Sequence, residues 1–168
     1  MIFRGRIWKF SDDVNTDLII PGRYLDNYDP KHLAAHAMEG ANKDFASKVG
    51  PGDVILGGKN FGCGSSREQA VIAIKHAGVS AVVARSFSRI FYRNAINLGL
   101  PVVISADAHT VFDEGDYVVL DLEVCTIATC DRSKRAAVEA IPDHLQRILL
   151  SGGLVPHLRS KILDEGGS

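Results

Sequence analysis

Residues 53–104 alternate short apolar runs with longer segments of helical periodicity, and this alternation restricts the possible folds more than any other feature of the chain. The apolar runs are 54–56, 81–84 and 100–104, and the helical segments are 67–77 and 87–97. Strands that alternate with helices predict a parallel sheet joined by right-handed crossovers. We therefore expect an α/β fold with a parallel sheet at its core.

The flanking regions predict further elements around this unit. Asp29 and Pro30 are typical of a helix N-cap followed by proline at the first helical position. The expected elements are a strand at 2–10, a helix at 30–38, an antiparallel pair of strands at 117–120 and 124–129, a helix at 142–150, and a frayed end at 164–168. No repeat or linker divides the chain, so we expect one domain spanning 1–168.

Composition excludes some classes of function. The 19 basic and 20 acidic residues give a formal net charge of -1, which disfavours a dedicated nucleic-acid binder. The three cysteines, Cys63, Cys125 and Cys130, show no close pairing pattern and fit a reducing compartment. The N-terminal residues are not typical of a signal peptide, and no run approaches the ~20 apolar residues of a membrane span. We expect a soluble, cytoplasmic protein without nucleic-acid or membrane partners.

The segment 58–68 combines residues that favour anion binding. Gly62 and Gly64 allow the backbone to turn tightly between a buried strand and a helix. Ser65 and Ser66 stand at the helix start, where free N–H groups and the helix dipole favour negative charge. Arg67 adds a planar donor group that matches a carboxylate or phosphate. The pattern predicts an anion site with a hydroxyl beside it.

Three other interpretations of this segment exist. Ser65 or Ser66 could simply cap the helix, with Glu68 or Gln69 completing a capping arrangement. Gly62-x-Gly64 after a strand also resembles a dinucleotide-binding turn, although Arg67 occupies the third glycine position. A serine-hydrolase elbow fits less well, because the order of residues departs from G-x-S-x-G.

Four stretches of the sequence resemble one known family. The segment 60–68 is similar to the signature loop of the swivelling domain of the aconitase superfamily, and the resemblance continues through 12–21, 84–95 and 97–101. The chain length resembles that of separate small subunits of the isopropylmalate isomerase or homoaconitase type. The resemblance implies a mixed three-layer β/β/α swivelling domain with a parallel core, acting as a hydro-lyase with alkyl-malate substrates, as in leucine biosynthesis.

The resemblance also implies a division of labour between two chains. A large subunit would carry a [4Fe–4S] cluster whose iron acts as a Lewis acid, and this chain would hold no metal. In the family pattern Ser65 corresponds to the catalytic base, and Ser66 and Arg67 correspond to binders of a substrate carboxylate. Cys63 is expected to fill space in the loop, and Cys125 and Cys130 to be packing or surface residues of a strand.

Substrate discrimination in this family is implied to lie in the loop after the motif Asn15-Thr16-Asp17. That specificity loop consists here of Arg23, Tyr24, Leu25, Asp26, Asn27 and Tyr28. Asp26 stands where homoaconitase-like relatives carry an arginine, and its charge would repel a third substrate carboxylate. This favours an alkyl-malate, contacted by Leu25 or a tyrosine, although Arg23 could swing in as a charge partner. Alternatively the loop is a solvated turn.

The remaining candidates have weaker support. His32 and His36 have metal-ligand spacing, but a surface helix face is the favoured interpretation. Arg85, Arg89 and Arg93 recur every four residues and could border the anion site, an interface or a solvated face. Two rival functions stay open, a dinucleotide-binding module and a non-catalytic domain that binds a dicarboxylate.

Overall fold

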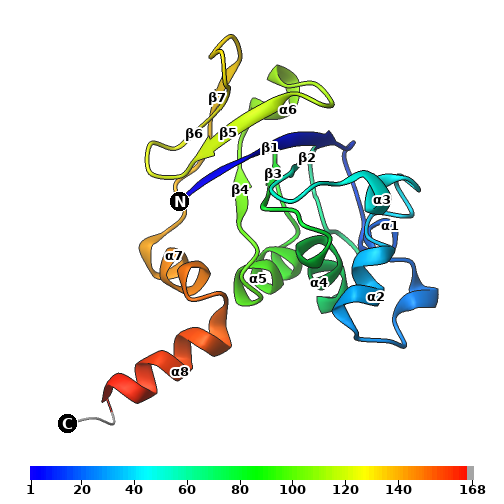
Figure 1. Cartoon of the computed structure of the whole chain (residues 1–168), viewed down its shortest axis with the longest axis vertical. Coiled ribbons are helices and arrows are strands. Elements are labelled where there is room, and N and C mark those ends of the chain that lie inside the picture. The colour runs from blue at the N-terminus through cyan, green and yellow to red at the C-terminus, as the bar shows by residue number, and fades with distance from the viewer. Residues whose placement is uncertain (166–168) are drawn as a thin grey trace.

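A single mixed sheet of seven strands runs through the computed structural model, which describes residues 1–165 (Figure 1). Its strand order is β4-β3-β2-β1-β5-β6-β7. The strands are β1 (Ile2–Lys9), β2 (Val54–Gly57), β3 (Ala81–Ala84), β4 (Val102–Ile104), β5 (Tyr117–Asp121), β6 (Thr126–Thr129) and β7 (Arg135–Ala137). The mixed α/β architecture agrees with the sequence-based expectation.

Strand β1 divides the sheet into two halves. On one side β1, β2, β3 and β4 are parallel, with Ile7 opposite Val54 and Val54 opposite Ala81. On the other side β1, β5, β6 and β7 are antiparallel, with Gly5 opposite Val118. The parallel core predicted from the alternation of strands and helices is therefore confirmed, and so is the antiparallel pair that follows it.

The helices gather mainly around the parallel half (Figure 1). They are α1 (Thr16–Ile19), the 3-10 turn η1 (Gly22–Tyr24), α2 (Pro30–Ala35), α3 (Phe45–Lys48), α4 (Glu68–His76), α5 (Arg89–Asn97), α6 (Ala108–Val111), α7 (Asp143–Leu150) and α8 (Leu154–Glu165). The last helix, α8, points away from the body of the molecule. None of the helices within residues 1–165 combines the length and the apolar character needed to span a bilayer.

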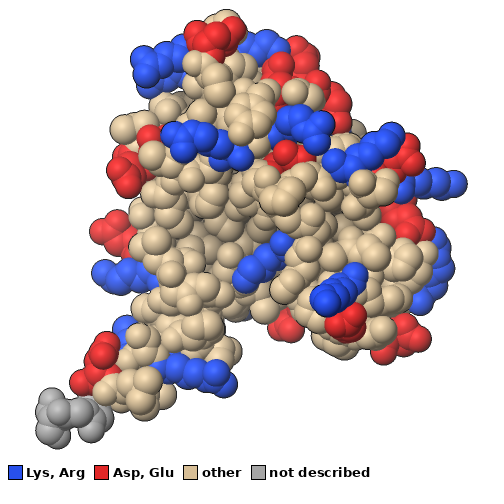
Figure 2. Space-filling view, in the orientation of Figure 1, with Lys and Arg blue, Asp and Glu red and all other residues tan. Residues whose placement is uncertain are grey.

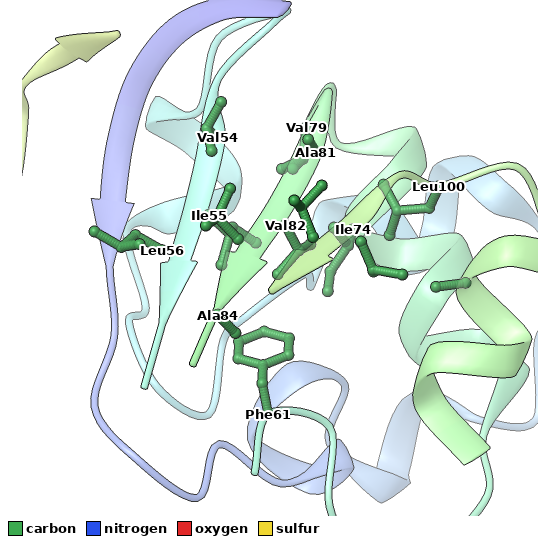
Figure 3. Packing of buried hydrophobic residues seen from close by; sticks show 14 of the residues in the cluster. Val54, Ile55, Leu56, Phe61, Ile74, Val79, Ala81, Val82, Ala84 and Leu100 are labelled. Carbon is green, nitrogen blue, oxygen red and sulfur yellow. The ribbon is translucent and has the colours of Figure 1, made fainter. Parts of the chain in front are cut away.

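Strands β2 and β3 form the centre of the hydrophobic core, because every residue in both is buried (Figure 3). This explains their unbroken apolar sequences, which are typical of parallel strands covered on both faces. Phe61 packs below the ends of these strands and is itself buried. The core therefore reaches directly under the loop that follows β2.

Several boundaries differ from those that the sequence predicted. The helix at 30–38 ends at Ala35, although Asp29 caps it as expected, accepting a hydrogen bond from the N–H of His32 at 3.1 Å. Strand β6 begins at Thr126, because Cys125 occupies a turn with a φ of 53°. The predicted frayed end is wrong for residues 164–165, which belong to α8, and its last three residues lie outside the described part.

Candidate active site

The segment 58–67 lies at the carboxyl end of β2 and leads into α4. In open α/β sheets this edge is where ligands commonly bind, since the loops that leave parallel strands meet there. Ser65 and Ser66 are both exposed on this loop. The structure therefore presents the two predicted hydroxyls to solvent instead of burying them.

Hydrogen bonds hold this loop against the segment 14–16. The N–H of Gly62 donates to the carbonyl of Val14 at 2.7 Å, and the N–H of Thr16 donates to the carbonyl of Cys63 at 2.8 Å. The Thr16 hydroxyl donates to the carbonyl of Ser65 at 3.1 Å. The segment 14–16 therefore fixes the backbone that leads up to Ser65 and the carbonyl of Ser65 itself.

Two glycines make this path possible. Gly62 and Gly64 have φ values of +78° and +93°, a conformation that side chains rarely tolerate. A Cβ on Gly62 would lie 2.2 Å from Cγ of Phe91, so the loop approaches α5 as closely as its backbone allows. Phe61 packs edge-on against Phe91 with ring centroids 5.4 Å apart. Both contacts fix the loop on α5.

The serines do not cap α4. The N-cap residue is Arg67, in an extended conformation with φ −139° and ψ 105°, and no side chain caps the helix start. The capping interpretation of Ser65 and Ser66 is therefore wrong. Their hydroxyls stay available at the positive end of a nine-residue helix, where negative charge is favoured.

Arg67 is oriented by the neighbouring motif. Its Nη1 donates to Oδ1 of Asp17 and to the carbonyl of Ile20, both at 3.2 Å, and its side chain is 20% exposed. Asp17 is 67% exposed, so this pair faces solvent and not the core. Such an exposed pair adds little stability. Its main effect is to aim the guanidinium, with both bonds made by the same nitrogen.

The specificity loop begins at the same carboxylate. The N–H of Gly22 donates to Oδ1 of Asp17 at 3.2 Å, so Asp17 contacts both Arg67 and the start of η1. Tyr24 and Leu25 are half-buried and pack against the core. The exposed members of the loop are Arg23, Asp26, Asn27 and Tyr28. The two predicted regions of the site are thus brought together at Asp17.

One residue of this region was missed by sequence reasoning. Glu39 accepts hydrogen bonds from Arg23 at 2.6 Å and from the Tyr24 hydroxyl at 2.9 Å. His36 contacts the other carboxylate oxygen at 2.7 Å. The hydrogen bond with His36, aided by those from Tyr24 and Arg23 and opposed by burial, holds the pKa of Glu39 below its usual value. No spacing or motif in the sequence indicated this cluster.

The remaining histidine and arginine candidates lie outside the two loops of the site. His32 and His36 are half-buried, and their rings pack in an aromatic cluster with Tyr24. The Arg85 guanidinium donates through Nη2 to the Thr110 hydroxyl. Arg89 and Arg93 border a hollow of about 480 Å³ beside α5, and neither Ser65 nor Ser66 lines it.

A known family model covers the part of the chain that holds the candidate site. A model of the aconitase C-terminal domain matches residues 13–107, which contain both loops and the helices α4 and α5. The chain belongs to the aconitase C-terminal domain family. The resemblance noted in the sequence is therefore confirmed.

Individual members of the aconitase family cover nearly the whole chain. The small subunit 1 of 3-isopropylmalate dehydratase from Methanopyrus kandleri is 53% identical over 154 residues, which are 92% of this chain and 91% of that protein. The methanogen homoaconitase small subunit of Methanothermobacter thermautotrophicus is 52% identical over 166 residues, 98% of this chain and 95% of that protein.

A solved structure from the same family shares the fold. The crystal structure of 3-isopropylmalate dehydratase from Methanocaldococcus jannaschii matches with a TM-score of 0.94 and 49% sequence identity, covering 99% of this chain and 98% of that one. The α/β fold class predicted from the sequence is confirmed by this match.

Proposed function

We propose that this chain is the small subunit of a 3-isopropylmalate dehydratase. This hydro-lyase interconverts 2- and 3-isopropylmalate by dehydration and rehydration in leucine biosynthesis. The observation that carries the proposal is the exposed pair Ser65 and Ser66, unused as helix caps, beside an oriented Arg67 at the start of α4. The names of the aconitase-family relatives support the same conclusion.

Each of these residues has a role that its chemistry suits. Ser65 removes the proton from a substrate carbon as its alkoxide, because the positive end of α4 and the Arg67 guanidinium both favour a negative oxygen there. Ser66 and Arg67 hold a substrate carboxylate, for which the guanidinium supplies a planar pair of donors. Asp17 keeps Arg67 in the orientation that this binding needs.

In this proposal the iron–sulfur cluster belongs to a partner chain. Within residues 1–165 no group of three or more potential ligand side chains could hold a metal ion, and the three cysteines are free. Burial, aided by the charge of Asp13, raises the pKa of the Cys63 thiol, whereas a cluster ligand must be a thiolate. These residues do not fit a [4Fe–4S] cluster, which we assign to a large subunit that completes the active site.

The specificity loop supports an alkyl-malate substrate. Asp26 is exposed and has no cationic partner within 4 Å among the described residues. Its charge disfavours a substrate with a third carboxylate, such as homoaconitate, and favours an alkyl-malate. A relative from Methanocaldococcus jannaschii, 47% identical, is named an isopropylmalate/citramalate isomerase small subunit, which is consistent with small alkyl groups. Homoaconitase activity is the alternative to be tested.

Two further expectations belong to the proposal. Residues 1–168 act as one domain, which the continuous seven-stranded sheet supports. The protein works in the cytoplasm, which its free thiols support, because such a compartment keeps cysteines reduced.

Anaerobic reconstitution with the large subunit tests this function. Isopropylmalate, homoaconitate, citrate and short alkyl-malates are assayed side by side, with each subunit alone as the control. We expect turnover only with both subunits and the highest kcat/KM with isopropylmalate. Equal activity without this chain would contradict the proposal, and tight NADP binding by the chain alone would favour the dinucleotide-binding alternative.

A further inference from the structure

The Glu39 carboxylate gathers the polar ends of three side chains. Oε1 accepts hydrogen bonds from Nη2 of Arg23 at 2.6 Å and from the Tyr24 hydroxyl at 2.9 Å. Oε2 lies 2.7 Å from Nδ1 of His36. The Glu39 side chain is 23% exposed, so these contacts are partly shielded from water. Hydrogen bonds to an ionised group are about twice as strong as neutral ones.

The three partners are also stacked on one another. The Tyr24 ring lies parallel to the His36 ring, with centroids 3.6 Å apart and an angle of 8°. The Arg23 guanidinium stands 4.6 Å from the centroid of the Tyr24 ring, within the range of a cation–π contact. The conformation of η1 is therefore set by side chains that all end on Glu39.

Hydrogen bonds join the backbone on both sides of Glu39 to residues 18–19, next to the residue that orients Arg67. The N–H of Met38 donates to the carbonyl of Ile19 at 2.7 Å, and the N–H of Gly40 donates to the carbonyl of Leu18 at 3.1 Å. The next carbonyl, that of Ile20, accepts the bond from Nη1 of Arg67. Glu39 is thus built on a segment that runs alongside the one orienting Arg67.

These contacts determine which group the Arg23 guanidinium pairs with. Its guanidinium is neutralised by Glu39, whereas Asp26 stays exposed three residues further along. Without the Glu39 charge, Arg23 would be free to approach a substrate carboxylate. We infer that Glu39 is the positioning residue of the specificity loop and that it excludes tricarboxylate substrates by holding Arg23 away from them. The link to substrate choice rests on the proposed function.

Kinetics of the reconstituted enzyme test the inference. Glu39→Gln keeps the size of the side chain and an acceptor for Tyr24, but loses the charge that binds Arg23. We expect its ratio of kcat/KM for isopropylmalate to kcat/KM for homoaconitate to fall about fivefold, a change of the size that one exposed ion pair produces. In Arg23→Gln/Glu39→Gln the freed cation is gone, so the ratio should return toward that of the wild type.

The control is Glu123→Gln, an exposed carboxylate near the N-terminal amine and far from the site. It should leave the ratio unchanged. An unchanged ratio in Glu39→Gln, or a double variant no closer to the wild type than the single one, would overturn the assignment. A merely structural role for Glu39 would lower both kcat/KM values together and leave their ratio alone.

Hydrogen exchange of the full chain separates this inference from the proposed function. The amides of Tyr24 and Leu25 donate within η1, to Pro21 and Gly22. We expect Glu39→Gln to speed their exchange about tenfold while the amides of β2 and β3 keep their protection. If the wild-type enzyme lacks isopropylmalate activity, the proposed function fails, but this measurement still decides whether Glu39 holds the loop. Unchanged exchange would mean that it does not.

Discussion

The two loops of the candidate site meet at Asp17 but are held by different kinds of contact. The catalytic loop, residues 58–67, is held mainly by backbone hydrogen bonds to residues 14–16 and by the packing of Phe61 on Phe91. The specificity loop, residues 23–28, is held by side chains that converge on Glu39. Backbone contacts are insensitive to most substitutions, whereas contacts through side chains change with each one.

This difference suits the two tasks that we propose. A base must keep its geometry whatever the substrate, and a backbone frame provides that. A specificity loop must vary between relatives with different substrates, and it can do so when its side chains are exposed. On the face shown in Figure 2, charged side chains are scattered among a larger area of uncharged residues.

The strongest test of the catalytic loop is Ser65→Ala. If this hydroxyl is the base, turnover in the reconstituted enzyme should fall about 1,000-fold, the usual contribution of a general base. Substrate binding should change little, because Ser66 and Arg67 remain. Ser47→Ala, at an exposed serine in α3 outside both loops, is the matched control and should keep full activity. Normal turnover in Ser65→Ala would remove the proposed base.

The backbone frame of the catalytic loop can be broken with Gly62→Ala. The new Cβ would overlap Phe91, and the alanine would have to keep a left-handed backbone conformation. We therefore expect a loss of about 3 kcal/mol in the free energy of unfolding. Gly115→Ala is an informative control, because Gly115 has a similar φ of +85° but no atom within 4 Å of the new Cβ. It should cost only about 1 kcal/mol in urea unfolding. Equal losses would mean that close packing on α5 does not fix the loop.

The specificity loop should respond in selectivity and not in stability. Asp26→Arg replaces a repelling charge with an attracting one at an exposed position, so kcat/KM for homoaconitate relative to isopropylmalate should rise about tenfold. Asp26→Asn removes the charge without adding one and should give a smaller rise. If neither variant changes the ratio, the loop does not select the substrate.

Sequence reasoning predicted those parts of the molecule whose information is local. The unit from β2 to β4 was predicted because buried strands and amphipathic helices have distinct periods. The segment from Gly62 to Arg67 stood out because its special residues are adjacent in the chain. Both features depend on residues within a few positions of each other.

The parts that were missed depend on distant contacts. Helices α3 and α6 and strand β7 have three or four residues each, too few for a periodic signal, and are stabilised by their neighbours in the fold. Helix α8 was not predicted, although Pro156 lies in its first turn, where proline is tolerated. Glu39 contacts Arg23 from 16 residues away, so only the folded chain reveals its role.

Acid should loosen the two loops unequally. The pKa of Glu39 lies below its ordinary value of 4.5, mainly because of its hydrogen bond with His36. A carboxyl group with a lowered pKa in the folded state stabilises that state above its ordinary pKa, and this contribution disappears as the pH falls through the lowered value. Below about pH 4.5 the contacts of Glu39 with Arg23, Tyr24 and His36 should therefore weaken.

Hydrogen-exchange protection factors measured between pH 6 and pH 3 would show the effect. The amides of Tyr24 and Leu25 should lose protection before those of Gly62 and Thr16, whose acceptors are carbonyl oxygens that do not titrate. In Glu39→Gln the early loss should vanish, because that variant lacks the charge at every pH. Simultaneous loss in both loops would mean that acid acts on the whole fold, and that the specificity loop is not separately held by a titrating side chain.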